Sequence, residues 1–365
     1  MRRQVNLVRQ HQYWTSWPLK LREWFREIMR SSDSNSSLGK RAENQPEPQL
    51  SILMYHQIGR FEAMRVHRAN YCDAGRFARQ MGFLARAGFH VISLEQALAG
   101  LRCEKDLPPR AVLLTFDDAY AGFLEHALPV LVENRFPAVV YAISAWVGQR
   151  MRWADPLPGR AEPNLMSAGD LRAVMDAGVS VGSHGASHRK LGELAPAEQA
   201  QELGGSRAAL EDLLGQPVQH LCYPFGSFNA DTVRLAAEAG YRSGMTCLRG
   251  AATGFDHPLV LPRKAISFGD NLLGFAWKLF KQRPKPALEN WRRWGREHSA
   301  SLVDGPLRSG GETGVESGFD ALDCVNHGAC RSSGSKVGST VACAPGPRHS
   351  CSELPTDSAS DRSEP

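Results

Sequence analysis

Short apolar runs alternate with segments of helical periodicity through residues 50–268, and this alternation limits the fold more than any other feature. The apolar runs that we expect to form buried strands are Leu50–Tyr55, Ala111–Phe116, Ala138–Ile143, Val179–Gly182, His220–Tyr223 and Leu259–Leu261. The helical segments between them are Ala74–Ala87, Ala121–Glu133, Ala168–Ala177, Ala197–Leu214 and Ala230–Ala239. Glycine follows several of these helices, as a left-handed helix stop requires, at positions 88, 178, 215 and 240. This order predicts an α/β fold with a parallel sheet and outer helices, open or closed; we expect a distorted (β/α) barrel of about seven strands.

The segments on either side of this region have a different composition. Residues 1–48 contain a basic, tryptophan-bearing amphipathic helix over residues 13–30, followed by a linker rich in Ser, Asn, Glu and Pro. This segment lies in a membrane interface, packs on the central domain through its aromatic face, or is disordered. Residues 269–298 repeat the basic, Trp-rich pattern and predict a helical extension, whereas residues 299–365 are rich in Gly and Ser and predict a disordered tail. The central domain is therefore expected at residues 49–268.

Charge and hydropathy argue against several classes of partner. The formal net charge of +5 is mild for a chain of 365 residues and does not indicate a nucleic-acid partner. No apolar stretch approaches the ~20 residues that span a bilayer, and none of the signal-peptide type follows the first three residues. We therefore expect a cytoplasmic location, or a peripheral one on the inner membrane with contacts through residues 13–30 and 269–298.

Two polar motifs end apolar runs in the central domain. Thr115-Phe116-Asp117-Asp118 closes one run, and Ser183-His184-Gly185-Ala186-Ser187-His188 closes another. In a parallel barrel the carboxyl ends of the strands form one face, so these side chains are expected to meet. Catalytic zinc takes three protein ligands and leaves one position for water, which two histidines and one aspartate can provide. Neighbouring residues that leave a strand point in opposite directions, so the second aspartate can face the substrate as a base.

At this point the sequence resembles a known family, the polysaccharide deacetylases of carbohydrate esterase family 4. The resemblance covers about residues 50–268. It depends on three motifs in the family's order, which are Thr115-Phe116-Asp117-Asp118, His184 with His188, and Tyr223-Pro224-Phe225-Gly226. Two further segments resemble the branch that includes poly-N-acetylglucosamine deacetylases, namely Met54-Tyr55-His56 and Leu261-Pro262-Arg263.

The resemblance implies a role for each matching residue. Asp118, His184 and His188 match the ligands of a divalent metal, for which Zn²⁺ is expected. Asp117 matches the general base that takes a proton from the attacking water. The backbone N–H of Tyr223 matches a donor to the oxyanion that forms on the acetyl group. A general acid is still needed to protonate the leaving amine.

The chain departs from the family pattern at three places. No histidine follows the last strand, so we expect His56 to be the general acid, with His257 as the alternative. Cys222 lies near the position where many members carry an arginine that orients the base. Arg263 is expected to replace that arginine; otherwise it is a surface cation. Ala119 stands where glycine is common, and a positive φ there would be costly for alanine.

These features predict a hydrolase of non-peptide carbon–nitrogen bonds. It would remove N-acetyl groups from an N-acetylated amino sugar in a polysaccharide, oligosaccharide or glycolipid and release acetate. One alternative is a metal-free carbohydrate-binding or scaffold module in polysaccharide assembly. The other is an amidohydrolase that acts on a non-sugar amide. The presence of all three ligand residues favours an enzyme over the metal-free module.

Overall fold

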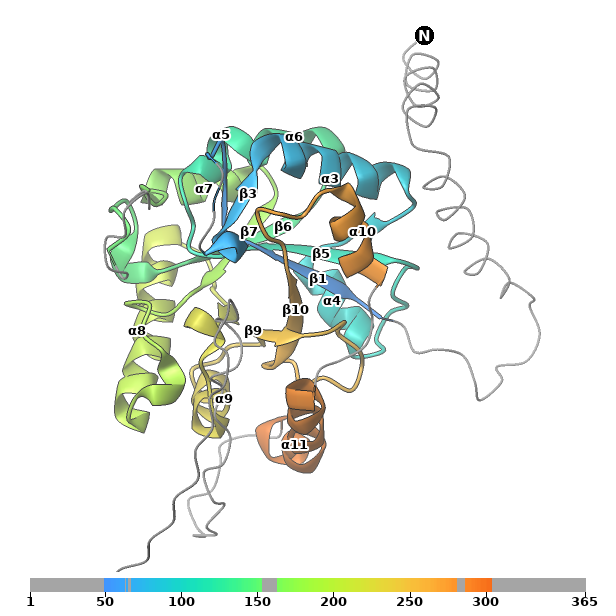
Figure 1. Ribbon diagram of the computed structural model, residues 1–365. Helices are drawn as coiled ribbons and strands as arrows, with labels where there is room; N and C mark the ends of the chain where they lie inside the picture. Colours follow the sequence, from blue (N-terminus) through green and yellow to red (C-terminus); the bar gives the residue numbers. More distant parts are fainter. Residues whose placement is uncertain (1–48, 63, 65–66, 153–162, 281–285, 304–365) are drawn as a thin grey trace, which may run out of the picture. The chain divides into compact units, whose positions relative to one another are not determined.

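The central domain is a closed parallel barrel with helices outside it (Figure 1). The computed structural model describes residues 49–303 except 63, 65–66, 153–162 and 281–285. Seven parallel strands close the ring, in the order β1 (Ser51–Tyr55), β10 (Leu261–Ala265), β9 (Ser243–Arg249), β8 (His220–Cys222), β7 (Val179–Ser183), β6 (Ala138–Ala142) and β5 (Ala111–Phe116). The pairing of β5 with β1 completes the ring, from Ser51 opposite Val112 to Tyr55 opposite Phe116. The prediction of a distorted barrel of about seven strands is therefore confirmed.

Alternate residues of each strand face opposite sides of the barrel wall. In β1, Leu53 packs in the cluster that the outer helices share, whereas Ile52 packs in a second cluster. In β5, Leu114 packs in the first of these clusters and Leu113 in the second. Because both faces of the wall are buried, these strands are continuous apolar runs in the sequence. The strand β4 (His90–Val91) pairs with the first residues of β5, outside the closed ring.

The outer helices follow the strands in the order expected from the sequence. Their bounds are α3 (Ala74–Arg86), α4 (Leu94–Leu101), α5 (Gly122–His126), α6 (Leu128–Asn134), α7 (Ala168–Asp176), α8 (Pro196–Leu214) and α9 (Ala230–Glu238). The expected left-handed helix stops are confirmed, with positive φ at glycines 88, 178, 215 and 240. The helix predicted over 121–133 is divided into α5 and α6, because Pro129 has no N–H to continue the hydrogen-bond ladder.

Two more helices follow residue 269 in the sequence, and both pack on the outside of the barrel domain. α10 (Leu272–Phe280) packs on α3, where the rings of Phe275 and Phe83 meet edge to face at 6.1 Å. α11 (Pro286–Val303) turns Trp291 toward the domain, with its ring centroid 4.7 Å from that of Phe228. None of the helices within the described residues has the length and apolar character needed to cross a bilayer. The helix and linker predicted for residues 1–48, and the tail from residue 304, lie outside the described residues.

Candidate active site

The polar motifs meet at the carboxyl-terminal ends of the barrel strands. Asp117 and Asp118 directly follow β5, and His184 follows β7. His56 follows β1 and Tyr223 follows β8. Because the strands are parallel, these residues gather at one end of the barrel, which is the end where barrel enzymes carry their active sites.

Three side chains in this group converge on one point. Asp118 Oδ1 lies 3.3 Å from His184 Nε2 and 3.3 Å from His188 Nε2, and all three side chains are buried. Tetrahedral zinc with bonds of about 2.0–2.2 Å places neighbouring ligand atoms about 3.3–3.6 Å apart. The two distances from Asp118 Oδ1 therefore match the spacing around a single metal ion, and all three ligand atoms lie within 4.8 Å of one another.

The hydrogen bond of His184 to the backbone also suits a metal ligand. Its Nδ1 lies 2.7 Å from the carbonyl oxygen of Cys222. A carbonyl oxygen only accepts hydrogen bonds, so Nδ1 carries a hydrogen and Nε2 is the nitrogen that can bind a metal ion when the ring is neutral. Burial lowers the pKa of His184, but Cys222, Asp118 and Asp117 outweigh burial and raise that pKa, so a bound cation would take the place of the proton on Nε2. Burial raises the pKa of Asp118, but the two imidazoles outweigh burial and hold that pKa well below its usual range. An ionised carboxylate thus faces imidazole nitrogens across a space that a cation would fill.

The backbone around these side chains is strained. Four of the eight non-glycine residues with positive φ among the described residues lie here: Asp118 (71°), Ala119 (53°), His188 (62°) and Phe225 (59°). Each such residue costs on the order of 1–2 kcal/mol relative to ordinary backbone. The expectation that Ala119 occupies a position suited to glycine is confirmed.

Asp117 has a different partner from its neighbour. Its two carboxylate oxygens accept hydrogen bonds from both terminal nitrogens of Arg263, each at 2.7 Å. Arg263 is 1% exposed and also donates to the Thr246 carbonyl, Thr115 Oγ1 and Cys222 Sγ. The interpretation of Arg263 as a surface cation is wrong. Burial raises the pKa of Asp117, but the charge and hydrogen bonds of Arg263 outweigh it, and the net pKa is lowered.

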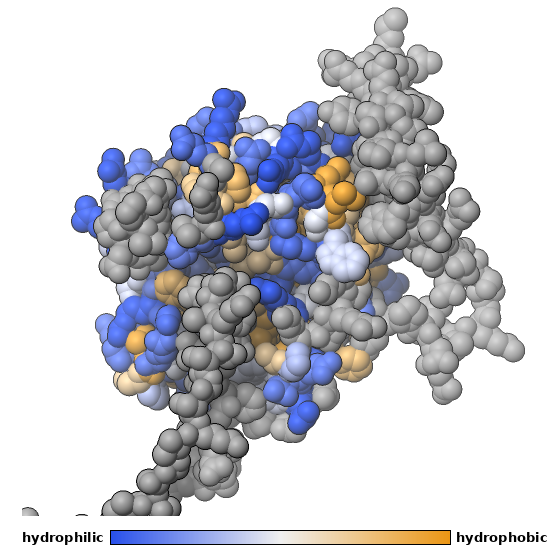
Figure 2. All heavy atoms as spheres, viewed as in Figure 1, coloured by the Kyte–Doolittle hydropathy of each residue, from blue (hydrophilic) through white to orange (hydrophobic). Residues whose placement is uncertain are grey.

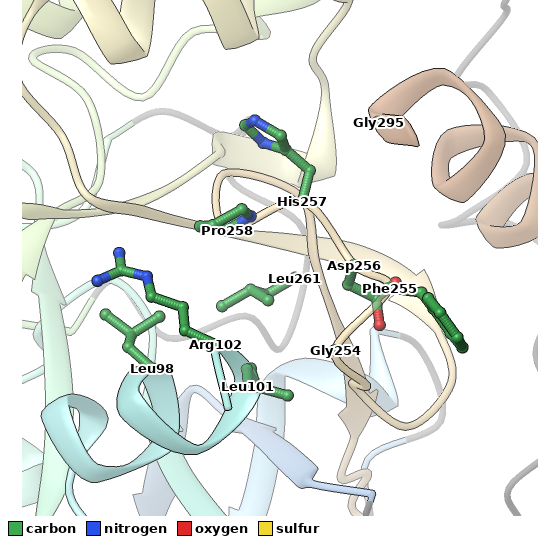
Figure 3. A pocket seen from close by; sticks show the side chains of 10 residues that line it. All are labelled: Leu98, Leu101, Arg102, Gly254, Phe255, Asp256, His257, Pro258, Leu261 and Gly295. Atoms are coloured by element: carbon green, nitrogen blue, oxygen red, sulfur yellow. The ribbon is translucent and has the colours of Figure 1, made fainter. Parts of the chain in front are cut away.

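The two candidate general acids lie at different ends of the barrel. His56 Nε2 is 3.8 Å from Asp117 Oδ2, and the His56 side chain is 16% exposed. His257 precedes β10, at the amino-terminal ends of the strands, beside an apolar cavity of about 270 Å³ (Figure 3). Burial lowers the pKa of His257 to about 4. The structure therefore brings His56, and not His257, to the aspartates.

The backbone N–H of Tyr223 is already used within the barrel. It donates to the carbonyl oxygen of Met245 at 3.0 Å, so the prediction that it is the oxyanion donor is wrong. Two residues later, the ring of Phe225 lies 4.5 Å from the ring of His188. The N–H of Phe225 makes no hydrogen bond to the described residues, which leaves it free to meet a substrate. Sequence reasoning missed this group, because the end of the β8 ladder is not visible in the sequence.

The chain is similar in sequence to known polysaccharide deacetylases. Residues 104–244 match the family model described as polysaccharide deacetylase. Bacillus subtilis YxkH, whose name assigns it provisionally to the polysaccharide deacetylases, is 26% identical over 243 residues, or 67% of this chain and 79% of YxkH. A poly-beta-1,6-N-acetyl-D-glucosamine N-deacetylase of Staphylococcus aureus is 24% identical over 169 residues, which are 44% of this chain and 56% of that relative.

A solved structure shows the same fold. The Streptococcus pyogenes deacetylase PplD, in complex with acetate, superposes with a TM-score of 0.56 at 24% sequence identity. The match covers 64% of this chain and 99% of that one.

Proposed function

Because the chain belongs to the polysaccharide deacetylase family, we propose that it is a metal-dependent hydrolase that removes N-acetyl groups from an N-acetylated amino sugar. The substrate would be part of a polysaccharide, oligosaccharide or glycolipid, and the products would be acetate and a free amine. One observation carries the proposal, which is the convergence of Asp118, His184 and His188 at 3.3 Å beside an aspartate held by arginine. The name of the S. aureus relative supports poly-N-acetylglucosamine as a substrate to test first.

A divalent cation fits the three converging side chains, and Zn²⁺ is the ion that we propose. When bound, it would polarise the acetamide carbonyl and lower the pKa of a water molecule. Asp117 accepts the proton of that water as it adds to the acetyl carbon, because each oxygen keeps a lone pair beyond its bond to Arg263. The N–H of Phe225 donates to the oxyanion. When the carbon–nitrogen bond breaks, His56 gives a proton to the departing amine.

The test is acetate release from short N-acetylglucosamine oligomers with a panel of added metals. Wild type is compared with Asp117→Asn and His184→Ala, and with His126→Ala as a control histidine on α5. We expect metal-dependent release that falls by about 10²–10⁴-fold in the two site variants and stays unchanged in the control. Metal-independent release would contradict the proposal. Oligomer binding by a wild type that takes up no metal would favour a carbohydrate-binding module instead.

We also propose that α10 contacts a membrane surface. Leu273 and Trp277 are four residues apart on this helix and are 47% and 60% exposed, and hydrophobic residues reach the surface where α10 lies (Figure 2). Lys281, Arg283 and Lys285 follow the helix in the sequence and would attract anionic lipid. The tryptophans of α11 pack on the domain core, so the contact predicted for residues 269–298 is narrowed to α10. A peripheral location on the inner membrane agrees with this surface.

Co-sedimentation with vesicles tests the membrane proposal. We expect wild type to bind anionic phosphatidylglycerol vesicles more strongly than neutral ones. The Leu273→Ser/Trp277→Ser variant should lose this binding, whereas Phe255→Ser, which removes another exposed aromatic residue, should keep it. Equal binding by wild type and the double variant would remove the basis for a contact at α10.

A further inference from the structure

The loop between the two metal-site histidines has its backbone polar groups paired by other parts of the fold. The N–H of Gly185 donates to Ser183 Oγ at 3.2 Å, and the N–H groups of Ala186 and Ser187 donate to Glu202 Oε2, each at 2.9 Å. The carbonyl of Gly185 accepts from Ser206 Oγ at 2.9 Å. The short 3-10 turn Ser144–Trp146 donates to the carbonyls of Gly185 and Ala186. The backbone of this loop is in neither a helix nor a strand, so the partners named above determine its path.

Glu202 is the main partner of the loop. It is 7% exposed and is the only buried glutamate among the described residues. A buried carboxylate requires compensating donors, and here the loop supplies the two N–H groups and the hydroxyl of Ser187. Ser206 lies four residues later on the same face of α8, and its hydroxyl is 2.8 Å from Ser183 Oγ. We call Glu202 and Ser206 the α8 clasp.

The clasp matters because the two histidines are held unequally. His184 comes directly after β7, and its N–H donates to the Ala142 carbonyl in the sheet. His188 comes four residues later, at a φ of 62°, in the loop that follows β7. Its Nε2 must nevertheless lie 3.3 Å from Asp118 Oδ1. The path of the intervening loop determines where the backbone of His188 lies relative to that of His184.

From these contacts we propose that Glu202, assisted by Ser206, is a positioning residue that holds the His184–His188 loop in the shape needed to bind a metal ion. The proposal rests on the proposed function only in the assignment of the metal site. Groups around the direct ligands typically change metal affinity by about 10–100-fold when they are removed. The clasp acts on the ligand loop, because its hydrogen bonds go to the N–H groups of Ala186 and Ser187, the Ser187 hydroxyl and the Gly185 carbonyl.

Two substitutions of Glu202 separate hydrogen bonding from charge. Glu202→Met keeps the volume but removes every acceptor, which leaves two loop N–H groups without partners. Glu202→Gln keeps an acceptor for both N–H groups, and its amide can donate to the Ser187 hydroxyl, which then accepts. Gln201→Met places the same residue on an exposed position of α8 and is the matched control. Ser206→Ala weakens the other half of the clasp.

The first measurement is Zn²⁺ affinity by competition with a chromophoric chelator. We expect Glu202→Met to weaken Zn²⁺ binding by about 10–100-fold and Ser206→Ala to weaken it less. Glu202→Gln and Gln201→Met should stay close to wild type. Wild-type affinity in Glu202→Met, or an equal loss in the Met and Gln variants, would overturn the proposal. If Glu202→Met does not fold, the comparison of Ser206→Ala with Gln201→Met decides the matter.

The second measurement is amide hydrogen exchange of the metal-free protein, which depends on neither metal nor substrate. The segment that contains Ala186 and Ser187 should exchange faster in Glu202→Met, while the strands of the barrel keep their wild-type rates. Unchanged exchange in this segment would also overturn the proposal. If wild type binds no Zn²⁺ but the exchange result holds, the metal assignment fails and the clasp stands as a device that orders the loop.

Discussion

The buried pair of Arg263 and Asp117 gives the sharpest test of how the site is built. Both side chains are almost fully inside the barrel, and five hydrogen bonds fix the guanidinium, two of them to the carboxylate at 2.7 Å. Arg263→Met keeps much of the volume but removes the charge and all the donors. Asp117 is then left as a buried anion whose nearest cationic candidate is His56 at 3.8 Å.

The size of the effect follows from what is left unpaired. Removal of one partner from a buried ion pair typically costs about 3–5 kcal/mol, because the remaining charge has lost both water and its counter-ion. Replacement of both partners by apolar residues of similar volume is often close to neutral. We therefore expect Arg263→Met to destabilise the domain by about 3–5 kcal/mol. The double variant Arg263→Met/Asp117→Leu should recover at least about 2 kcal/mol of this loss.

Urea unfolding followed by tryptophan fluorescence measures these differences. A chelator keeps metal binding from adding to the stability of some variants and not others. Arg102→Met is the matched control, since Arg102 is exposed and its ion pair with Glu104 is 3.9 Å long. We expect this control to change the unfolding free energy by less than about 0.5 kcal/mol. A cost below about 1 kcal/mol for Arg263→Met, or strictly additive single-variant costs, would refute the reasoning.

Three further predictions concern the backbone and pH. Ala119→Gly should raise the midpoint of thermal unfolding, because relief of a φ of 53° is worth about 1–2 kcal/mol and exceeds the roughly 0.4–1 kcal/mol of added chain entropy. Gly182→Ala should destabilise by about 1–3 kcal/mol in urea unfolding, because its Cβ would lie 2.6 Å from the ring of Tyr141 and 2.8 Å from the His220 carbonyl. The folded-state pKa of His257, about 4, lies below the unfolded value of about 6.5. Its contribution to stability is therefore fully present above pH 6.5 and is lost toward pH 4 at up to about 1.4 kcal/mol per unit. His257→Gln should remove this part of the acid sensitivity, as unfolding free energies at pH 7 and pH 5 will show.

The strands that sequence reasoning found are continuous apolar runs, whereas β9 was missed although it is largely buried. β9 was not predicted, because Gly244, Thr246 and Cys247 interrupt its apolar residues. The last strand was predicted at 259–261 but runs over Leu261–Ala265. It includes Arg263 and Lys264, which look like the end of a strand in the sequence. Both are buried because each has partners distant in sequence, and Lys264 donates to Ser51 Oγ and the Leu279 carbonyl.

The candidate site was predictable where adjacency in the sequence fixes the geometry. The adjacent aspartates at the end of β5 and the histidine at the end of β7 lie at the same end of the barrel because the strands are parallel, and only β6 separates the two strands in the ring. The oxyanion donor was misassigned, because only the structure shows that Tyr223 still donates within the barrel. Glu202 gave no signal, since a glutamate among several charged residues of a long helix usually faces water.

The two adjacent aspartates illustrate how one turn of backbone gives like residues unlike chemistry. Asp118 adopts a left-handed φ of 71°, and this turn separates its carboxylate from that of Asp117. One carboxylate then meets two imidazoles and the other meets a guanidinium, so both pKa values are lowered and both groups are ionised at neutral pH.

Asp117 gains a fixed orientation from Arg263 at the expense of basicity, and a weak base holds a transferred proton only briefly. His56 Nε2 lies 3.8 Å from Asp117 Oδ2, so in the proposed reaction His56 is the nearby group that would receive this proton. We therefore expect catalysis by the arginine-bound Asp117 to depend on His56. His56→Gln should lower kcat for acetate release far more than it changes KM. An equal change in both constants would assign His56 to substrate binding instead.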